Sequence, residues 1–224
     1  MNTNVADILP KNKIQQKNGE VFYPSEESKK MGETDYQHLQ ISILEQQLRL
    51  FLSEKKDVYL ASDLIVYYEE GNPNRRFAPD LMICFGVENK KRRSYKIWEE
   101  KQVPSIIIEV ASEATWQKDV TTKRRLYEKL SVAEYYVIDP EYKYLPQPIL
   151  AYRLEFGELV RLSIQNDRIL SAVLNLEIVN TGEDFRFFDA EKNEFISTVS
   201  DISSVKDENT QLKAEIERLK KLIK

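Results

Sequence analysis

Residues 104–112 have the sequence PSIIIEVAS, in which one carboxylate, Glu109, interrupts an apolar run. A short apolar run bounded by turn residues is typical of a strand buried in a sheet. Side chains alternate between the faces of a strand, so Glu109 lies on the face opposite to Ile108 and Val110. Both faces are otherwise apolar, which predicts a central strand that is covered on both sides.

A second acid, Asp80, opens the run DLMICF at residues 80–85, which Pro79 and Gly86 bound. This run also reads as a buried strand, with Asp80 at the rim of the sheet where a cleft can open. If the two strands are neighbours, the start of one and the end of the other bring the carboxylates together. Buried charges are normally paired or bound to metal, so the pair suggests a metal-dependent hydrolytic site.

A lysine in the next segment is the third unexpected charge. A helix is predicted over about residues 119–130, and Lys123 falls on the inward stripe defined by Val120 and Tyr127. Taken alone, such a lysine more often buries its stem and extends its ammonium to water. Its coincidence with two buried acids favours a functional role. Asp119, at the start of the predicted helix, is expected to be an N-cap.

The composition excludes several classes of protein. The chain has 224 residues, of which 42% are hydrophobic, and this length suits one domain with appendages. A single cysteine, Cys84, excludes an intrachain disulfide and a cysteine-based zinc site. The longest apolar runs are too short to cross a bilayer, and residues 1–5 lack the features of a secretory signal. We therefore expect a cytoplasmic protein.

The net charge of -4 argues against a protein that coats nucleic acid through bulk positive charge. A nuclease, however, needs only a local basic track. The candidate nucleic-acid contacts are Lys118, Arg124, Arg92 and Arg93. An equally good interpretation is that most of these are solvated charges of loops and helices.

The chain divides into three parts: a polar N-terminal arm at 1–33, a core domain at 34–196 and a C-terminal helix at 197–224. The core opens with an amphipathic helix over about 35–52, with Thr34 or Asp35 as its cap. Its buried stripe is Ile41, Leu44, Leu48 and Phe51 or Leu52. Apolar strands such as 134–138 alternate with helical and polar segments. This order predicts an α/β fold with a mixed β-sheet flanked by helices.

Several blocks of this sequence recur, in the same order, in a known family. They are APDLMI at 78–83, SYKIWEE at 94–100, PSIIIEVAS at 104–112, the helix from Asp119 through Lys123 to Tyr127, and EYYVIDP at 134–140. The chain resembles the Uma-two type family of restriction-endonuclease-like proteins, within the PD-(D/E)xK nuclease superfamily. The resemblance covers about residues 34–155. It implies the superfamily's sheet with flanking helices and Mg²⁺-dependent cleavage of phosphodiesters.

The resemblance implies metal ligands. Asp80 and Glu109 would bind Mg²⁺ or Mn²⁺, with the backbone carbonyl of Val110 as a further ligand. Glu45, in the first helix, resembles an extra acid that some superfamily members use as an outer metal contact. An acid at the edge of an apolar stripe usually just faces water, and that alternative stays open for Glu45.

The superfamily's lysine usually stands two residues after the glutamate, but that position is Ala111 in this chain. The resemblance suggests that the lysine has moved to the following helix, where Lys123 matches, and Lys118 is its rival. Bound Mg²⁺ lowers the pKa of a water and neutralises charge on the phosphate. Lys123 would orient that water or stabilise the developing negative charge.

The C-terminal segment carries a heptad repeat. Its a positions are Ile202, Asn209, Ile216 and Ile223, and its d positions are Val205, Leu212 and Leu219. Isoleucine at a with leucine at d favours two parallel helices, and an asparagine at a reinforces that choice. Glu208 and Glu215 at g face Lys213 and Lys220 at e of a parallel partner. The pattern predicts a homodimeric coiled coil; the alternative is a single helix packed on its own domain. About three heptads is short for stability, so the core should contribute contacts.

Together these features predict a dimeric, metal-dependent endonuclease that acts on DNA through Asp80, Glu109 and Lys123. The main alternative is a catalytically inactive nuclease fold that serves as a DNA-binding or dimeric scaffold protein. A third is a structural protein whose heptad helix binds a different partner. The sequence leaves open DNA against RNA or branched substrates, and Mg²⁺ against Mn²⁺.

Overall fold

The computed structural model describes residues 16–17, 20–23 and 34–222. The core opens with helix α1 (Asp35–Phe51), where Thr34 is the N-cap and its Oγ1 accepts a hydrogen bond from the amide of Gln37 at 3.2 Å. Leu44 and Leu48 of α1 are fully buried. The predicted helix, its cap and its apolar stripe are confirmed.

A six-stranded mixed sheet forms the centre of the fold, with strand order β11-β10-β9-β8-β6-β3. Its strands are β3 (Val58–Ser62), β6 (Leu81–Phe85), β8 (Ile106–Val110), β9 (Glu134–Ile138), β10 (Ile149–Glu155) and β11 (Glu158–Arg161). Strands β8 and β9 run parallel, and all other neighbours in this sheet are antiparallel. Strand β8 is buried along its whole length, as predicted for a central strand.

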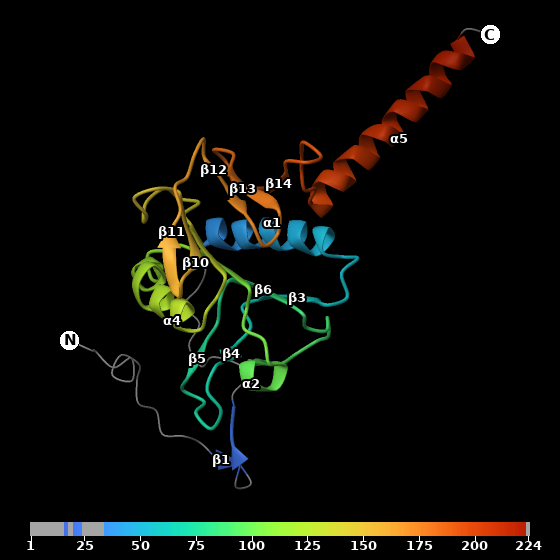
Figure 1. Ribbon diagram of the computed structural model, residues 1–224. Helices are drawn as coiled ribbons and strands as arrows, with labels where there is room; N and C mark the ends of the chain where they lie inside the picture. The colour runs from blue at the N-terminus through green and yellow to red at the C-terminus, as the bar shows by residue number, and fades with distance from the viewer. Residues whose placement is uncertain (1–15, 18–19, 24–33, 223–224) are drawn as a thin grey trace.

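Helix α1 covers one face of this sheet, between it and a second antiparallel sheet (Figure 1). The second sheet consists of β12 (Arg168–Ser171), β13 (Leu176–Asn180), β14 (Phe185–Asp189) and β15 (Glu194–Phe195). Leu48 of α1, Ile108 of β8 and Phe187 of β14 belong to one apolar core. Each such buried side chain stabilises the fold by roughly 1.5–3 kcal/mol. Apolar contacts therefore hold α1 from both sides.

The opposite face of the six-stranded sheet packs against a second apolar core, in which Ile107 and Tyr127 are buried. The elements on this side are α3 (Trp116–Lys118), η2 (Asp119–Lys123), α4 (Arg124–Lys129), α2 (Ile97–Glu100), and the small sheet of β4 (Val66–Tyr67), β5 (Arg76–Phe77) and β7 (Tyr95–Lys96). Ile107 and Ile108 lie on opposite faces, as the period-two pattern predicted.

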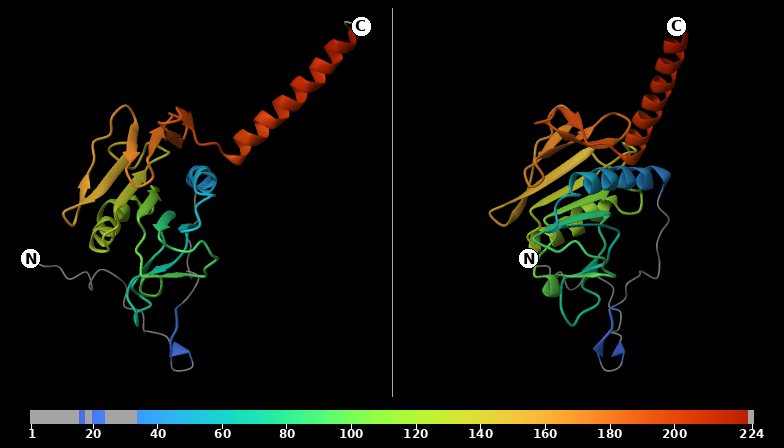
Figure 2. Two further views of the ribbon diagram at one scale, coloured as in Figure 1. Left: turned by 45° about the vertical axis from the view of Figure 1, so that its right-hand side comes forward. Right: turned by 90° about the vertical axis from the view of Figure 1, so that its right-hand side faces the viewer.

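Two peripheral elements complete the description. In the N-terminal arm, β1 (Gln16–Lys17) pairs with β2 (Glu20–Val21), and the ring of Tyr23 lies 5.0 Å from that of Tyr67; the rest of the arm lies outside the described residues. Helix α5 (Val199–Leu222) extends away from the body (Figures 1 and 2). None of the helices among the described residues has the length and apolar character that a bilayer span requires.

Candidate active site

Glu109 forms the buried centre of the site, with no exposed surface on β8. Its carboxylate accepts two bonds from the helical segment that follows β8. Tyr127 Oη donates to Oε1 at 2.6 Å, and Lys123 Nζ donates to Oε2 at 2.8 Å. Because an unpartnered charge is costly at this depth, these two donors lower the cost of an ionised Glu109.

Asp80 reaches Glu109 because β6 and β8 are antiparallel neighbours. Leu81 at the start of β6 pairs with Ile108 near the end of β8, so the same antiparallel register brings Asp80 beside Glu109. Asp80 Oδ2 accepts from the Val110 amide at 2.7 Å, and the Asp80 amide donates to Glu109 Oε2 at 3.4 Å. The strand adjacency on which the predicted carboxylate pair depended is therefore present.

The helix that carries Lys123 contains a π turn. Segments α3, η2 and α4 are continuous, and residues Asp119–Lys123 form the π-helical part. Residues four apart drift by about 40° around an α-helix, and the wider π turn takes up part of that drift. The turn thus helps Asp119, Lys123 and Tyr127 to project to one side. Since Lys118 is already helical, Asp119 lies inside the helix, and its predicted role as N-cap is wrong.

The ammonium of Lys123 bridges two carboxylates. Its Nζ lies 2.8 Å from Glu109 Oε2 and 2.9 Å from Asp119 Oδ1. Burial by itself lowers the pKa of Lys123, but the charges of Glu109, Asp119 and Asp80 outweigh burial and raise this pKa above its usual value. Lys123 therefore stays protonated at neutral pH.

The cluster holds more negative than positive groups. Burial, together with the charges of Asp80 and Asp119, raises the pKa of Glu109 to about 8, although Lys123 opposes the rise. Asp119 is only 1% exposed, and apart from the ion pair with Lys123 its carboxylate oxygens have no partner among the described residues. Three carboxylates share one ammonium, so an additional cation would stabilise their ionised forms.

The carbonyl of Val110, the predicted third ligand, faces α1. Gln37 is buried, and its Nε2 donates to this carbonyl oxygen at 3.2 Å. Neither this contact nor the bond from Tyr127 to Glu109 was foreseen. Two features of the sequence could have indicated these contacts. Helix α1 carries glutamines at stripe positions, and the inward stripe of the later helix carries a tyrosine instead of a leucine.

The donor set suits a hard divalent cation. Asp80, Glu109 and the Val110 carbonyl offer only oxygen atoms, which Mg²⁺ and Mn²⁺ prefer, and the surplus negative charge has the right sign. No group of three or more His, Cys, Asp and Glu side chains is arranged as a metal cage among residues 16–17, 20–23 and 34–222. Two acids, one carbonyl and several waters form the pattern by which Mg²⁺ is commonly held.

Glu45 of α1 has two side-chain partners in the structure. It binds Arg49 of the same helix, and its Oε2 accepts a bond from Ser62 Oγ at 3.0 Å. The bond from Ser62 connects the helix to the end of β3. A role for Glu45 as an outer metal contact stays a prediction.

The predicted nucleic-acid contacts differ in exposure. Lys118 and Arg93 are exposed, whereas Arg124 is half-buried, with its guanidinium 5.6 Å from the ring centroid of Tyr152. Lys118 lies on the same helical segment as Lys123, but it is Lys123 that reaches the carboxylates.

Arg92 is held inside the protein. Its side chain is 4% exposed, its Nε and Nη2 donate to both carboxylate oxygens of Glu100 at 2.7 and 2.9 Å, and its guanidinium stacks 4.2 Å from the ring centroid of Tyr59. A guanidinium committed in this way has no free edge for a phosphate, so the placement argues against the predicted contact. Basic side chains in a loop cannot be sorted into inward and outward ones by their spacing.

Comparisons with known proteins agree with the fold. Residues 15–180 match the Uma2 family, described as "Putative restriction endonuclease". A solved structure from Anabaena variabilis, described as a "putative nuclease belonging to DUF820", superposes with a TM-score of 0.50 at 14% identity, covering 70% of this chain and 80% of that one. No curated protein matches. At this identity the structure shows a shared fold. Since the family match spans more than half of its length, the chain belongs to the Uma2 family of restriction-endonuclease-like proteins.

Proposed function

We propose that this protein is a divalent-metal-dependent endonuclease that hydrolyses phosphodiester bonds in DNA, with Asp80, Glu109 and Lys123 as its catalytic residues. One observation supports the proposal most. The protonated amine of Lys123 lies 2.8 Å from a buried carboxylate of Glu109, which a second acid adjoins. A purely structural core gains little from burying such a group of charges.

Asp80, Glu109 and the carbonyl of Val110 would hold Mg²⁺ or Mn²⁺. When bound, such an ion lowers the pKa of a water and neutralises charge on the phosphate. In the hydrolysis, a water oxygen bonds to phosphorus, the bond from phosphorus to the leaving oxygen breaks, and the leaving oxygen gains a proton.

Lys123 would act through its positive charge. Because its pKa is raised, it is a poor base at neutral pH, and its role is to orient the attacking water or stabilise the charge that develops on the phosphate. Tyr127 would position Glu109 by donating to Oε1, which leaves Oε2 for Lys123 and the metal. Location in the cytoplasm is part of the same proposal.

Cleavage of supercoiled plasmid with Mg²⁺ or Mn²⁺ tests this function. The parent protein is compared with Asp80→Asn, Lys123→Met and a matched control, Arg125→Met, which makes the same kind of change at an exposed position of the same helix. We expect nicking that EDTA abolishes, a loss of about 10²-fold or more in the first two variants, and no change in the control. Circular dichroism establishes that each variant is folded.

Metal binding gives a second readout. Asp80→Asn should lose Mn²⁺ binding, whereas Lys123→Met should bind Mn²⁺ at least as tightly as the parent, because a neighbouring positive charge is gone. A Lys123→Met variant that cuts normally would disprove the role of the lysine. A parent protein that binds DNA but cuts no DNA or RNA under any metal would favour the inactive scaffold. Parallel assays on duplex, single-stranded and branched DNA and on RNA define the substrate.

A further inference from the structure

Helix α5 exposes an apolar seam that its own domain does not cover. The apolar seam side chains that the structure describes are 48–61% exposed, and they are Ile202, Leu212, Ile216 and Leu219. Ile223 lies outside the described residues. Figures 1 and 2 show α5 extending away from both sheets, which disfavours the alternative of a helix packed on its own body. An exposed apolar stripe on a projecting helix is typical of a surface that another helix covers.

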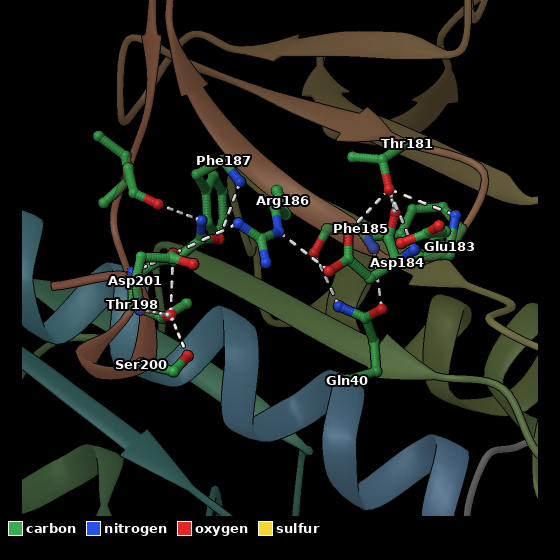
Figure 3. A network of polar contacts seen from close by, with 12 residues as sticks. Gln40, Thr181, Glu183, Asp184, Phe185, Arg186, Phe187, Thr198, Ser200 and Asp201 are labelled. Carbon is green, nitrogen blue, oxygen red and sulfur yellow. Dashed lines mark hydrogen bonds and ion pairs between the residues drawn. The ribbon is translucent and has the colours of Figure 1, made fainter. Parts of the chain in front are cut away.

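The beginning of α5 is fixed to the body by a polar network (Figure 3). The amide of Asp201 donates to Thr198 Oγ1 at 3.2 Å, and Asp201 Oδ2 accepts from the Thr198 amide at 2.7 Å, which is a reciprocal capping box. Arg186 of β14 donates to Asp201 at 3.3 Å and to Asp184 at 2.9 Å. The start of the helix is therefore tied to the second sheet.

Helix α1 supports the same region. Gln40 exchanges two bonds with the backbone of Phe185, at 2.8 and 2.9 Å (Figure 3). Gln47 accepts from the Phe187 amide at 3.0 Å and donates to the carbonyl of Ile196, just before α5. A helix that is already formed and anchored loses less conformational freedom on association, which helps a short coiled coil to be stable.

The charges beside the seam complement those of an identical helix. Glu208 and Glu215 occupy g positions, and Lys213 and Lys220 occupy the e positions that a parallel, in-register partner presents to them. Glu215 also lies 3.5 Å from Arg218 of its own helix, but both side chains are largely exposed, so this contact competes weakly.

We propose that α5 forms a parallel, two-stranded coiled coil with α5 of a second copy of this chain. Asn209 would face its counterpart at an a position, which favours two helices in this register. Because the coil is parallel and each helix is anchored at its start, both nuclease-like bodies would lie at the same end of the coil. Two sites held in this way suit a substrate with two strands.

Light scattering coupled to size exclusion tests the association independently of any cleavage. We expect the parent to have twice the 26.3 kDa mass of one chain. Leu212→Asp should reduce the mass to that of one chain, whereas Gln211→Asp should leave the dimer intact. The two variants are matched, because each puts an aspartate between Glu208 and Glu215, on the seam at a d position in one case and on the outer face at a c position in the other. Unchanged melting of the body shows that both remain folded.

Cysteine cross-linking tests the direction. The only native cysteine, Cys84, is buried. Leu219→Cys should form a disulfide-linked dimer under mild oxidation, since d positions face each other in a parallel coil. In an antiparallel coil of the same overlap the two cysteines would be about 20 Å apart at 1.5 Å per residue, so no link would form. A monomeric parent, a higher oligomer, or failure of Leu219→Cys to cross-link would each overturn the proposal.

Discussion

Tyr127→Phe removes one oxygen atom from the centre of the site. The Tyr127 hydroxyl donates to Glu109 Oε1 at 2.6 Å in a region without solvent exposure. Its ring packs edge-on against Phe77 at 5.1 Å and Tyr135 at 5.0 Å, and a phenylalanine preserves both contacts. The variant should therefore fold normally while leaving one carboxylate oxygen of Glu109 without its donor.

The size of the expected pKa change follows from the free energy of the lost hydrogen bond. A hydrogen bond to a charged group contributes about 1.5–3 kcal/mol, and about 1.4 kcal/mol corresponds to one pH unit in a pKa. The donor stabilises the ionised carboxylate more than the neutral acid, so its removal raises the pKa of Glu109. From a starting value of about 8, the pKa should rise by about 1–2. Since a metal must displace the proton, Mn²⁺ affinity at pH 7.5 should fall by roughly 10- to 100-fold.

Carbon-13 NMR of the Glu109 side-chain carboxyl, titrated in metal-free protein, measures this pKa directly, and calorimetry measures Mn²⁺ affinity at pH 7.5 and 9.5. The matched control is Tyr135→Phe, because Tyr135 is equally buried but donates to the carbonyl of Asp119 at 3.0 Å. An unchanged or lower Glu109 pKa in Tyr127→Phe would refute the reasoning. So would an equal effect of Tyr135→Phe.

Three further predictions concern stability. Glu109 has a raised pKa in the folded state and so binds its proton more tightly there than in the unfolded chain. Without metal, the free energy of unfolding should therefore fall as pH rises from about 4.5 to about 8. Glu109→Gln should flatten this pH dependence in thermal melts. Glu134→Gln removes a buried carboxylate that accepts from the Ala172 amide at 2.8 Å and links the two large sheets. We expect the free energy of unfolding, measured in urea, to fall by about 2–4 kcal/mol, and a fall below about 0.5 kcal/mol would contradict that role. Arg92→Met breaks the ion pair with Glu100 and should destabilise the fold by about 2–4 kcal/mol. It should leave the salt dependence of DNA binding unchanged. A reduced salt dependence would instead identify Arg92 as a phosphate contact.

Sequence patterns predicted correctly those features that depend on one helix or one strand alone. The alternation around Glu109 located a strand buried on both faces, and the 3.6-residue period located α1 and the inward position of Lys123. Periodicity reports which face of one element is buried, because burial on one face is a property of that element alone. It does not report which element lies opposite.

The directions of two other side chains could not be predicted, because they depend on neighbours distant in the sequence. Asp119 had the residue type of a helix cap, but the helix begins earlier and includes a π turn, so its carboxylate lies buried beside Lys123. Arg92 had the composition of a basic loop, but its guanidinium turns inward to Glu100 and Tyr59. Side-chain direction in turns and loops follows tertiary contacts that no periodic pattern encodes.

The sequence by itself determined three charges in apolar surroundings, at Asp80, Glu109 and Lys123, and the apolar seam of the last helix. Only the tertiary structure decided that β6 pairs with β8 in the antiparallel sense and that Tyr127 donates to the central carboxylate. Strand pairing is set by contacts across the whole domain, since each buried strand carries enough apolar surface to satisfy several neighbours. The sequence therefore supplies the site residues at separate positions, and the pairing of the strands brings them together.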